Sequence, residues 1–384
     1  MATYKDKILI SGDSHFGEPL DLWQKNLPAR FKDRAPNWPD LKEFVTNHHL
    51  REGCWEPHAR LKDMAVDGVS AEVLYPTQGA QLFAIGDVDL EKACATVYND
   101  YCIDFCSVSH DRLWGLGIIP TRDIDFAVSE LERVKKGGLN GAAIAIAPPA
   151  ELPYSDEHYE KFWQAAEALN MPLAMHINTR AKTAPNYEHG RTDRAGRILH
   201  SINGHKNDAQ SSLGHLISGG VMERYPKLQF SVAEIGVGWV PFWLQEFDYY
   251  ATSRMKLAQL PSEYFERAVT STFISDAVGG VLAKDYPFLQ YNAMWSSDYP
   301  HPACIWPDSI EIMEADLGAL DPAMQEVVVC TNAARVFNGG KLPPTAEKPA
   351  DDYEADTRLW AKEHGDFGNT SRLKNAFQAG RAHV

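Results

Sequence analysis

The sequence lacks the features that would bind it to a membrane or a nucleic acid. No apolar run approaches the roughly 20 residues that a membrane-spanning helix needs, and Met1–Lys7 is too charged for a signal peptide. The 384 residues carry a formal net charge of −15 and no basic arm, so the chain would repel phosphate backbones and anionic lipid. We therefore expect a soluble, cytoplasmic protein with no nucleic-acid and no membrane partner.

Cysteine is scarce and follows no spacing pattern. The six cysteines form no Cys-x-x-Cys pair and no regular framework, which indicates reduced thiols rather than a disulfide scaffold. No internal repeat is present at a period of roughly 20 to 50 residues. What remains is an ordinary globular composition with 44% apolar residues, and the length suits one large domain or two small ones.

Short apolar runs alternate with amphipathic stretches along the chain. Eight runs are predicted to be strands, at Ile8–Gly12, Ala71–Tyr75, Leu113–Ile118, Gly141–Ile146, Pro172–His176, Gln229–Glu234, Thr270–Ile274 and Ala293–Asp298. Helical patterns lie between several of them, at Glu91–Val108, Asp125–Lys136, Asp156–Leu169 and Gln210–Glu223. This alternation indicates an α/β protein with parallel βαβ units, in a doubly wound sheet or a barrel.

The count of eight strands favours a (β/α)8 TIM barrel. Candidate site residues follow strands that are far apart in sequence, the first, fifth, sixth and eighth. A barrel brings all strand ends around one mouth, whereas an open sheet gathers its ligand at a single switch point. We therefore predict one barrel domain over residues 1–340.

Two long loops and a tail interrupt the regular pattern. Residues 19–60 follow the first strand, and residues 178–207 follow the fifth and contain His189, His200 and His205. Loops of this length in a compact domain are usually lids or binding loops. The C-terminal extension, 341–384, is rich in proline at its start and has little to bury, so we expect it to pack on a partner subunit or to be mobile.

The first strand ends in Asp13-Ser14-His15. Residues two apart on a strand share a face, so Asp13 and His15 can both point into the barrel mouth. A carboxylate and an imidazole on one face form half of a divalent-metal site. The same sequence would also occur if Asp13 were a helix N-cap and His15 had no role as a ligand.

Two other strand ends carry metal-binding side chains. His176 ends an apolar run, where a histidine is more often a hydrogen-bonded core residue than a ligand. Asp298 ends another such run, and a buried carboxylate is costly unless it is paired or bound to metal. Taken together, the three strand ends predict a metal site at the mouth of the barrel.

At these positions the sequence resembles the amidohydrolase superfamily, in particular its amidohydrolase-2 branch of decarboxylases and hydrolases. The resemblance extends over about residues 8 to 338 and is carried by the segments 10–19, 60–69, 72–76, 219–228, 234–239 and 297–302. It implies a mononuclear metal site on Asp13, His15, His176 and Asp298.

The sequence departs from the pattern of this branch at two positions. Its decarboxylases begin with His-x-His or Glu-x-His, so Asp13 is a departure that keeps a metal-binding group. They end strand 6 with a histidine that polarises substrate or metal-bound water, and here that position is Glu234. A carboxylate cannot donate as an imidazole does unless it is protonated.

Glu234 is also a candidate ligand to a second metal ion. Together with Glu18 and a loop histidine such as His205, it would complete the donors for a dinuclear site. An alternative of equal weight is that Glu18, which precedes Pro19, is a carboxylate that stabilises the N-terminus of a helix. His215 lies at helical spacing, which favours a helix surface or a supporting role.

The resemblance and the residues together predict one or two divalent ions, zinc, manganese or iron, since a mixed carboxylate and imidazole set discriminates little between them. The leading interpretation is a hydrolase or decarboxylase of a small carboxylated or carbonyl substrate, with Asp298 as general base and Glu234 and His301 at the reacting groups. The alternatives are a dinuclear iron- or manganese-dependent oxygenase and a non-catalytic subunit of a related complex. A homo-oligomer, or a hetero-oligomer with a related subunit, is expected.

Overall fold

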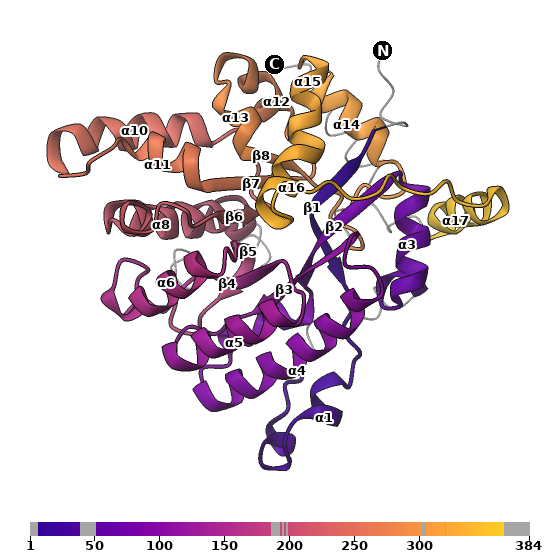
Figure 1. Ribbon diagram of the computed structural model, residues 1–384, viewed down its shortest axis with the longest axis horizontal. Coiled ribbons are helices and arrows are strands. Elements are labelled where there is room, and N and C mark those ends of the chain that lie inside the picture. The colour runs from indigo at the N-terminus through magenta and orange to yellow at the C-terminus, as the bar shows by residue number, and fades with distance from the viewer. Residues whose placement is uncertain are drawn as a thin grey trace.

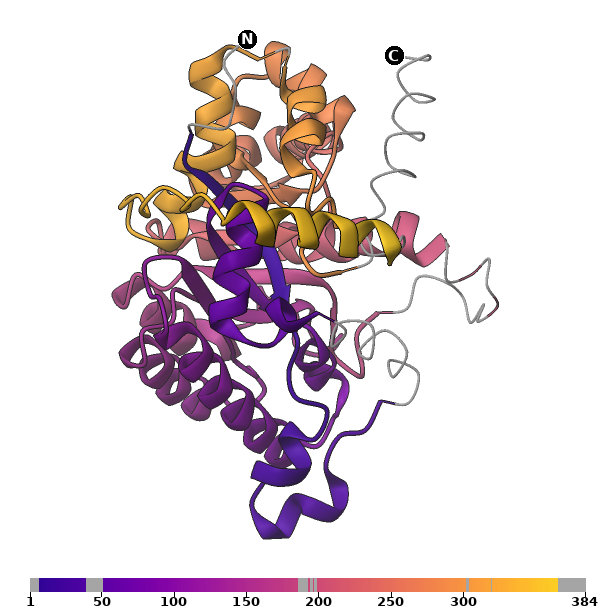
Figure 2. The same ribbon diagram turned by 90° about the vertical axis from the view of Figure 1, so that its right-hand side faces the viewer.

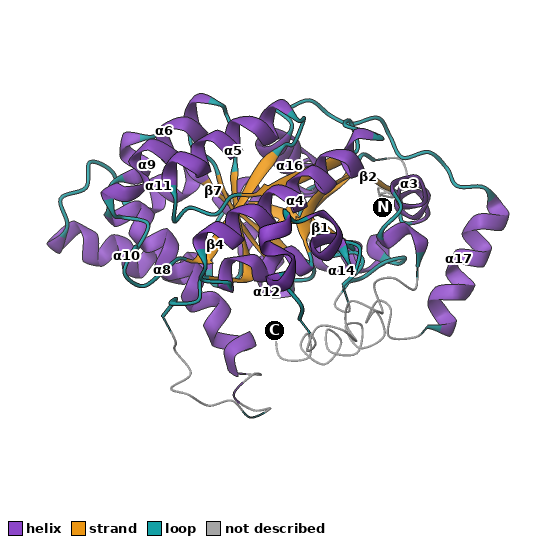
Figure 3. Ribbon diagram, turned by 90° about the horizontal axis from the view of Figure 1, so that it is seen from below, coloured by secondary structure: helices purple, strands orange, loops and turns teal. Residues whose placement is uncertain are grey.

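The computed structural model describes residues 7–38, 51–185, 193, 196, 199–301, 304–318 and 320–364. Eight strands form one sheet in sequence order, and helices surround them (Figures 1 and 3). The strands are β1 Leu9–Phe16, β2 Val69–Pro76, β3 Leu113–Ile118, β4 Gly141–Ala147, β5 Leu173–Arg180, β6 Phe230–Ala233, β7 Val269–Phe273 and β8 Ala293–Trp295. Every neighbouring pair from β1 to β8 is parallel.

The helices lie outside the strands and cover the barrel. They are α1 Leu22–Asn26, α3 Pro57–Val66, α4 Val88–Ser107, α5 Ile124–Lys136, α6 Glu160–Ala168, α8 His205–Ser218, α9 Val221–Arg224, α10 Val240–Arg254, α11 Pro261–Ala268, α12 Ala277–Asp285, α13 Phe288–Asn292, α14 Ser309–Leu317, α15 Pro322–Glu326, α16 Asn332–Phe337 and α17 Asp351–Glu363. Among the shorter turns is the 3-10 helix η5 at Gln78–Ala84.

Hydrogen bonds between β1 and the segment after β8 close the sheet into a barrel. The Asp298 N–H donates to the Asp13 carbonyl at 3.0 Å, and the His15 N–H donates to the Tyr299 carbonyl at 2.7 Å. A side chain at Gly12 would place its Cβ only 2.9 Å from the Cβ of Met294, so glycine permits the close approach of the two strands. The predicted (β/α)8 barrel is confirmed.

The burial of the strands explains why they could be recognised from the sequence. Every residue of β2, β3 and β4 is buried, as expected for parallel strands that are covered on both faces and read as continuous apolar runs. All six cysteines are buried and unpaired. Within the described ranges, no helix has the length and apolar character to cross a membrane.

Several predicted boundaries differ from the structure. The first strand continues beyond Gly12 to Phe16, because after a register shift Ser14 and His15 pair with Leu74 and Tyr75 of β2. The eighth strand ends at Trp295 rather than Asp298. The single helix predicted at 210–223 is two helices, α8 and α9, because Gly220 adopts a φ of 69°, a left-handed conformation that interrupts a helix.

The first 24 residues of the C-terminal extension, 341–364, pack on the barrel of the same chain. Helix α17 lies beside α3 (Figures 1 and 2). The Tyr353 hydroxyl donates to Asp63 at 2.9 Å, and the Arg51 guanidinium donates to Thr357 at 3.0 Å. A role of the extension at a subunit interface stays a prediction.

Of the two long loops, residues 39–50 of the first loop and His189 of the second lie outside the described residues.

A buried carboxyl on α4 makes the stability of the barrel depend on pH. Glu91 is 3% exposed, and its Oε2 accepts no hydrogen bond from a described residue. Burial raises the pKa of Glu91 to about 8 from an ordinary value of 4.5, and Arg122 opposes this rise. Between these pH values the folded state binds more protons than the unfolded state, so stability falls as pH rises.

Replacing Glu91 with glutamine should remove this dependence, because an amide does not ionise. The variant should match the wild type in urea denaturation at pH 5 and exceed it at pH 8.5, by on the order of 3 kcal/mol. Glu132→Gln, at an exposed position of α5, serves as the control and should leave the pH profile unchanged. A Glu91→Gln variant with the wild-type pH profile would contradict the assignment.

Candidate metal centre

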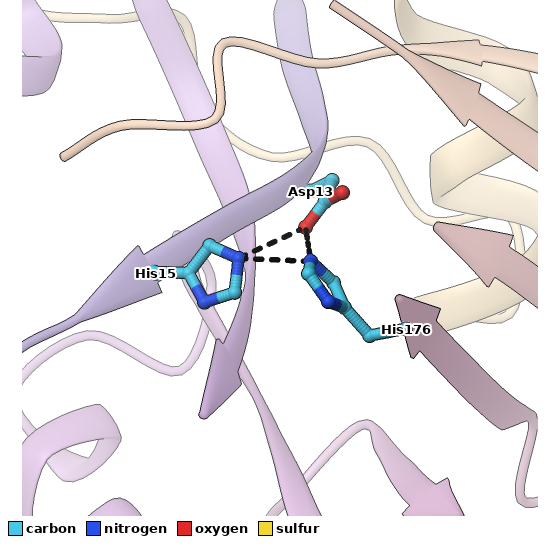
Figure 4. Close-up of side chains that lie close together, drawn as sticks. All are labelled: Asp13, His15 and His176. Carbon is cyan, nitrogen blue, oxygen red and sulfur yellow. Dashed lines mark hydrogen bonds and ion pairs between the residues drawn. The ribbon is translucent and has the colours of Figure 1, made fainter. Parts of the chain in front are cut away.

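Three side chains from two strands meet at the carboxyl ends of the barrel strands (Figure 4). Asp13 and His15 point from β1 and His176 from β5, and all three are buried. Asp13 Oδ1 lies 3.7 Å from the Nε2 atom of each histidine, and the two Nε2 atoms lie 3.0 Å apart. These donor atoms fall within 4.8 Å of one another, as the ligands of a single metal ion do.

The hydrogen bonds of the two imidazoles favour a cation between them. His15 Nδ1 donates to the Pro76 carbonyl at 3.1 Å, and His176 Nδ1 donates to the Ile177 carbonyl at 2.8 Å. Burial lowers the pKa of His176 to about 3, so its ring is neutral and its Nε2 carries a lone pair. The Nε2 atom of His15 lies 3.0 Å from that of His176, and because the Nδ1 atom of each ring carries the proton that its carbonyl accepts, both Nε2 atoms can direct a lone pair at one metal ion.

Asp298 and His301 extend the cluster on the side of β8. Asp298 Oδ1 lies 3.6 Å from His15 Nε2 and 3.2 Å from His301 Nδ1. The His301 ring stacks on the His15 ring with centroids 3.5 Å apart. His15, Asp298 and His301 therefore form a second group of donors within ligand distance of one another.

The carboxylates of the cluster have few hydrogen-bond donors. Within the described part of the chain, Asp13 Oδ1 and both oxygens of Asp298 accept no hydrogen bond. Burial, followed by the charge of Asp298, raises the pKa of Asp13, and burial raises the pKa of Asp298. Buried carboxylates without donors are costly unless they are protonated or bound to metal. The donor set thus fits a divalent cation.

The backbone is strained at two of the predicted site residues. Glu234 and Asp298 have φ values of 63° and 56°, in the left-handed region that non-glycine residues seldom occupy. Such a conformation costs about 1 to 3 kcal/mol and is concentrated at functional sites. At Asp298 the turn also directs the backbone N–H toward Asp13.

Glu234 lies at the edge of the cluster, directly after β6. Its Oε2 is 3.6 Å from His176 Nε2, and 19% of its side chain is exposed. The Glu234 N–H donates to Thr272 Oγ1 at 2.9 Å, and the Thr272 hydroxyl donates to Asp13 Oδ2 at 3.1 Å. Burial and then the charge of Asp298 raise the pKa of Glu234, while Lys206 lowers it.

A buried ion pair between Arg60 and Glu72 holds the backbone that carries part of the cluster. Arg60 Nε donates to Glu72 at 2.6 Å, and its Nη1 and Nη2 donate to the carbonyls of His15 at 2.7 Å and Tyr299 at 3.2 Å. Arg60 therefore joins the segments that carry His15 and Asp298. The sequence analysis did not identify Thr272, Arg60 and Glu72 as site residues. Thr272 and Glu72 could have been noticed as polar residues within buried strands.

Glu18 is not part of either donor group, and its role as a metal ligand stays a prediction. Its carboxylate accepts hydrogen bonds from the backbone N–H groups of Thr77, Gln78 and Gly79, at distances of 3.1, 2.9 and 3.0 Å. These N–H groups begin η5, so Glu18 stabilises the N-terminus of that helix. These contacts favour the alternative of a helix N-terminal carboxylate, and the helix concerned is η5.

The two helix histidines also lie outside both donor groups. His205 Nε2 lies 3.2 Å from the side-chain oxygen of Asn178, so its role as a second-metal ligand is not supported by the described contacts. His215 Nδ1 lies 3.0 Å from Ser155 Oγ, on a partly buried face of α8, as the helix-surface interpretation expected.

Comparison with known proteins gives relatives whose reported activities are decarboxylations. A gamma-resorcylate decarboxylase from Polaromonas sp. (strain JS666) is 23% identical over 300 residues, which is 73% of this chain and 86% of that protein. The solved 5-carboxyvanillate decarboxylase from Sphingomonas paucimobilis has a TM-score of 0.68 and 24% identity, covering 86% of this chain and 99% of that chain.

A second solved structure contains a metal ion. It is a dihydroxybenzoic acid decarboxylase from Polaromonas sp. JS666 with bound manganese and the inhibitor 2-nitroresorcinol, at a TM-score of 0.65 and 18% identity, covering 87% of this chain and 98% of that chain. The family model described as amidohydrolase matches residues 46–339. Because this match spans more than half of the 384 residues, the chain belongs to the amidohydrolase family and is an enzyme.

Proposed function

We propose that the chain is a metal-dependent decarboxylase or hydrolase of a small carboxylated substrate. Asp13, His15, His176 and Asp298 would hold one divalent ion. The observation that carries the proposal is the pair of Nε2 atoms that face each other at 3.0 Å, each of them 3.7 Å from Asp13 Oδ1. The decarboxylases found among the relatives favour loss of a carboxyl group over hydrolysis.

Each part of the site has a role in this proposal. A bound divalent ion would supply a Lewis acid that polarises a carboxylate or carbonyl oxygen. Loss of carbon dioxide leaves a carbon that must gain one proton, and Glu234 lies at the edge of the cluster where it can hold that proton. Asp298 and His301, 3.2 Å apart, can share a second proton.

A dinuclear oxygenase is the second candidate. The specific observation in its favour is the second donor group, His15, Asp298 and His301, together with the approach of Glu234 to His176. Two iron or manganese ions per chain would support this function, and one ion per chain supports the decarboxylase or hydrolase.

Metal removal should abolish turnover reversibly. The enzyme would be incubated with 2,6-dihydroxybenzoate and with 5-carboxyvanillate, and carbon dioxide release would be measured before and after chelation. We expect activity on a carboxylated aromatic to disappear with the metal and to return when manganese is added. The carboxylates and imidazoles of the site cannot polarise a substrate oxygen as a metal ion does. Turnover that survives complete chelation would contradict the proposal, and oxygen consumption would favour the oxygenase.

A further inference from the structure

A cavity of about 480 Å³ opens beside the metal centre, at the ends of β6 and β7. Glu234 lines it, and Glu234 Oε2 is also 3.6 Å from His176 Nε2. The cavity therefore adjoins the donor cluster, and a molecule bound in it can reach the centre past Glu234.

Most polar groups of the cavity wall are already paired. Asp276 accepts hydrogen bonds from the N–H groups of Val237 at 2.7 Å, Gly238 at 2.8 Å and Gly279 at 2.7 Å. The Ser275 hydroxyl donates to Asp316. These groups hold the wall in place and have little capacity left for a ligand.

Glu234 and Lys206 are the other charged groups of the wall, and Lys206 lies on the first turn of α8. It is the one cation among the described residues that line the cavity, and it is half-buried. Across the described part of the chain, its ammonium has no hydrogen bond or ion pair within 4.0 Å. A half-buried ammonium that has no hydrogen bond or ion pair within the described residues, although its charge acts on Glu234, is suited to bind an anionic group of a ligand.

The rest of the wall is apolar. Ile235, Trp239, Phe273, Ile274 and Val278 line the cavity. The Trp239 indole N–H donates to the Gly236 carbonyl at 3.1 Å, so this donor is used and the ring remains as apolar surface. A ligand with a flat or compact apolar body matches this lining.

We infer that Lys206 forms an anion-binding subsite, and that the enzyme selects substrates whose apolar body carries two anionic groups, one for the metal centre and one for Lys206. The inference rests on the proposed function, because the first group needs the metal. It adds a residue that determines specificity within the same site.

The test compares benzoate with its dicarboxylate counterparts, isophthalate and terephthalate. Binding to manganese-loaded enzyme would be measured by calorimetry. The better dicarboxylate should bind about 10-fold or more tightly than benzoate, since a hydrogen bond to a charged group contributes this much. Lys206→Met should reduce the preference to about 1, and Lys206→Arg should keep most of it. Lys182→Met changes an exposed lysine that does not line the cavity, and should leave the preference unchanged.

The outcomes separate this inference from the proposed function. A dicarboxylate preference that survives in Lys206→Met, or an absence of binding by all three acids, would overturn the inference. Carboxylate binding that is the same with and without manganese would instead contradict the metal-centred function. A benzoate affinity that depends on manganese but is not improved by a second carboxylate would reject the Lys206 subsite alone.

Discussion

Replacing His176 with alanine is expected to remove the bound divalent ion and turnover while the barrel stays folded. His176 contributes one of the two Nε2 atoms that face each other at 3.0 Å, and it lies within β5 as part of the donor cluster. Loss of a hydrogen-bonding partner of a ligand costs roughly 10- to 100-fold in metal affinity, so loss of the ligand itself should cost more. Metal content by plasma mass spectrometry, with circular dichroism for folding, checks this result.

Two histidine variants provide the comparison. His215→Ala changes a histidine of α8 that contacts Ser155 and lies outside both donor groups, and it should keep the full metal content. His205→Ala should also keep it, because His205 lies beside Asn178. Full metal occupancy in His176→Ala would reject the centre, and a loss of one of two ions in His205→Ala would restore this residue as a ligand.

Replacing Glu234 with glutamine should lower turnover by roughly 10²- to 10⁴-fold, the usual effect of losing a general acid or base. Under the proposed function the metal content should remain about one ion per chain, because the four ligands are intact. Under the dinuclear alternative it should fall from two ions to about one, since an amide oxygen is a neutral and weaker donor. Parallel measurements of metal content and initial rate distinguish the two.

Glu234→Asp is the matched variant for this experiment. It keeps the negative charge but withdraws the carboxylate by one methylene, so a metal ligand and a proton donor should both be weakened without being removed. Glu234→Gln with full activity and unchanged metal would show that Glu234 has no role in the reaction. The strained φ of 63° at this position would then have no functional explanation.

Much of the fold could be predicted because parallel strands that are buried on both faces appear as apolar runs. The run Gly141–Ala147 is wholly buried as β4, and its helical neighbours follow an amphipathic period. The errors lie where tertiary contacts decide the ends of elements. Pairing with β2 lengthens β1, and Gly220 divides the helix that was predicted at 210–223.

The candidate site was predictable to the extent that its residues come at the ends of apolar runs in the sequence. Asp13, His15, His176 and Asp298 follow apolar runs, and the barrel brings these ends together. Glu18 lies near His15 in sequence, but its carboxylate turns to the N–H groups of residues about 60 positions away. That contact, like the bonds from Arg60 to the carbonyls of His15 and Tyr299, depends on the folded barrel and has no local signal.

Anomalous diffraction from crystals of the manganese-loaded enzyme tests the central claim most directly. The account predicts an anomalous peak between Asp13, His15, His176 and Asp298, within coordination distance of the Nε2 atoms of both histidines. A second, weaker or equal peak toward His301 would identify the dinuclear form. No peak among these four residues, or manganese bound only elsewhere on the barrel, would contradict the account.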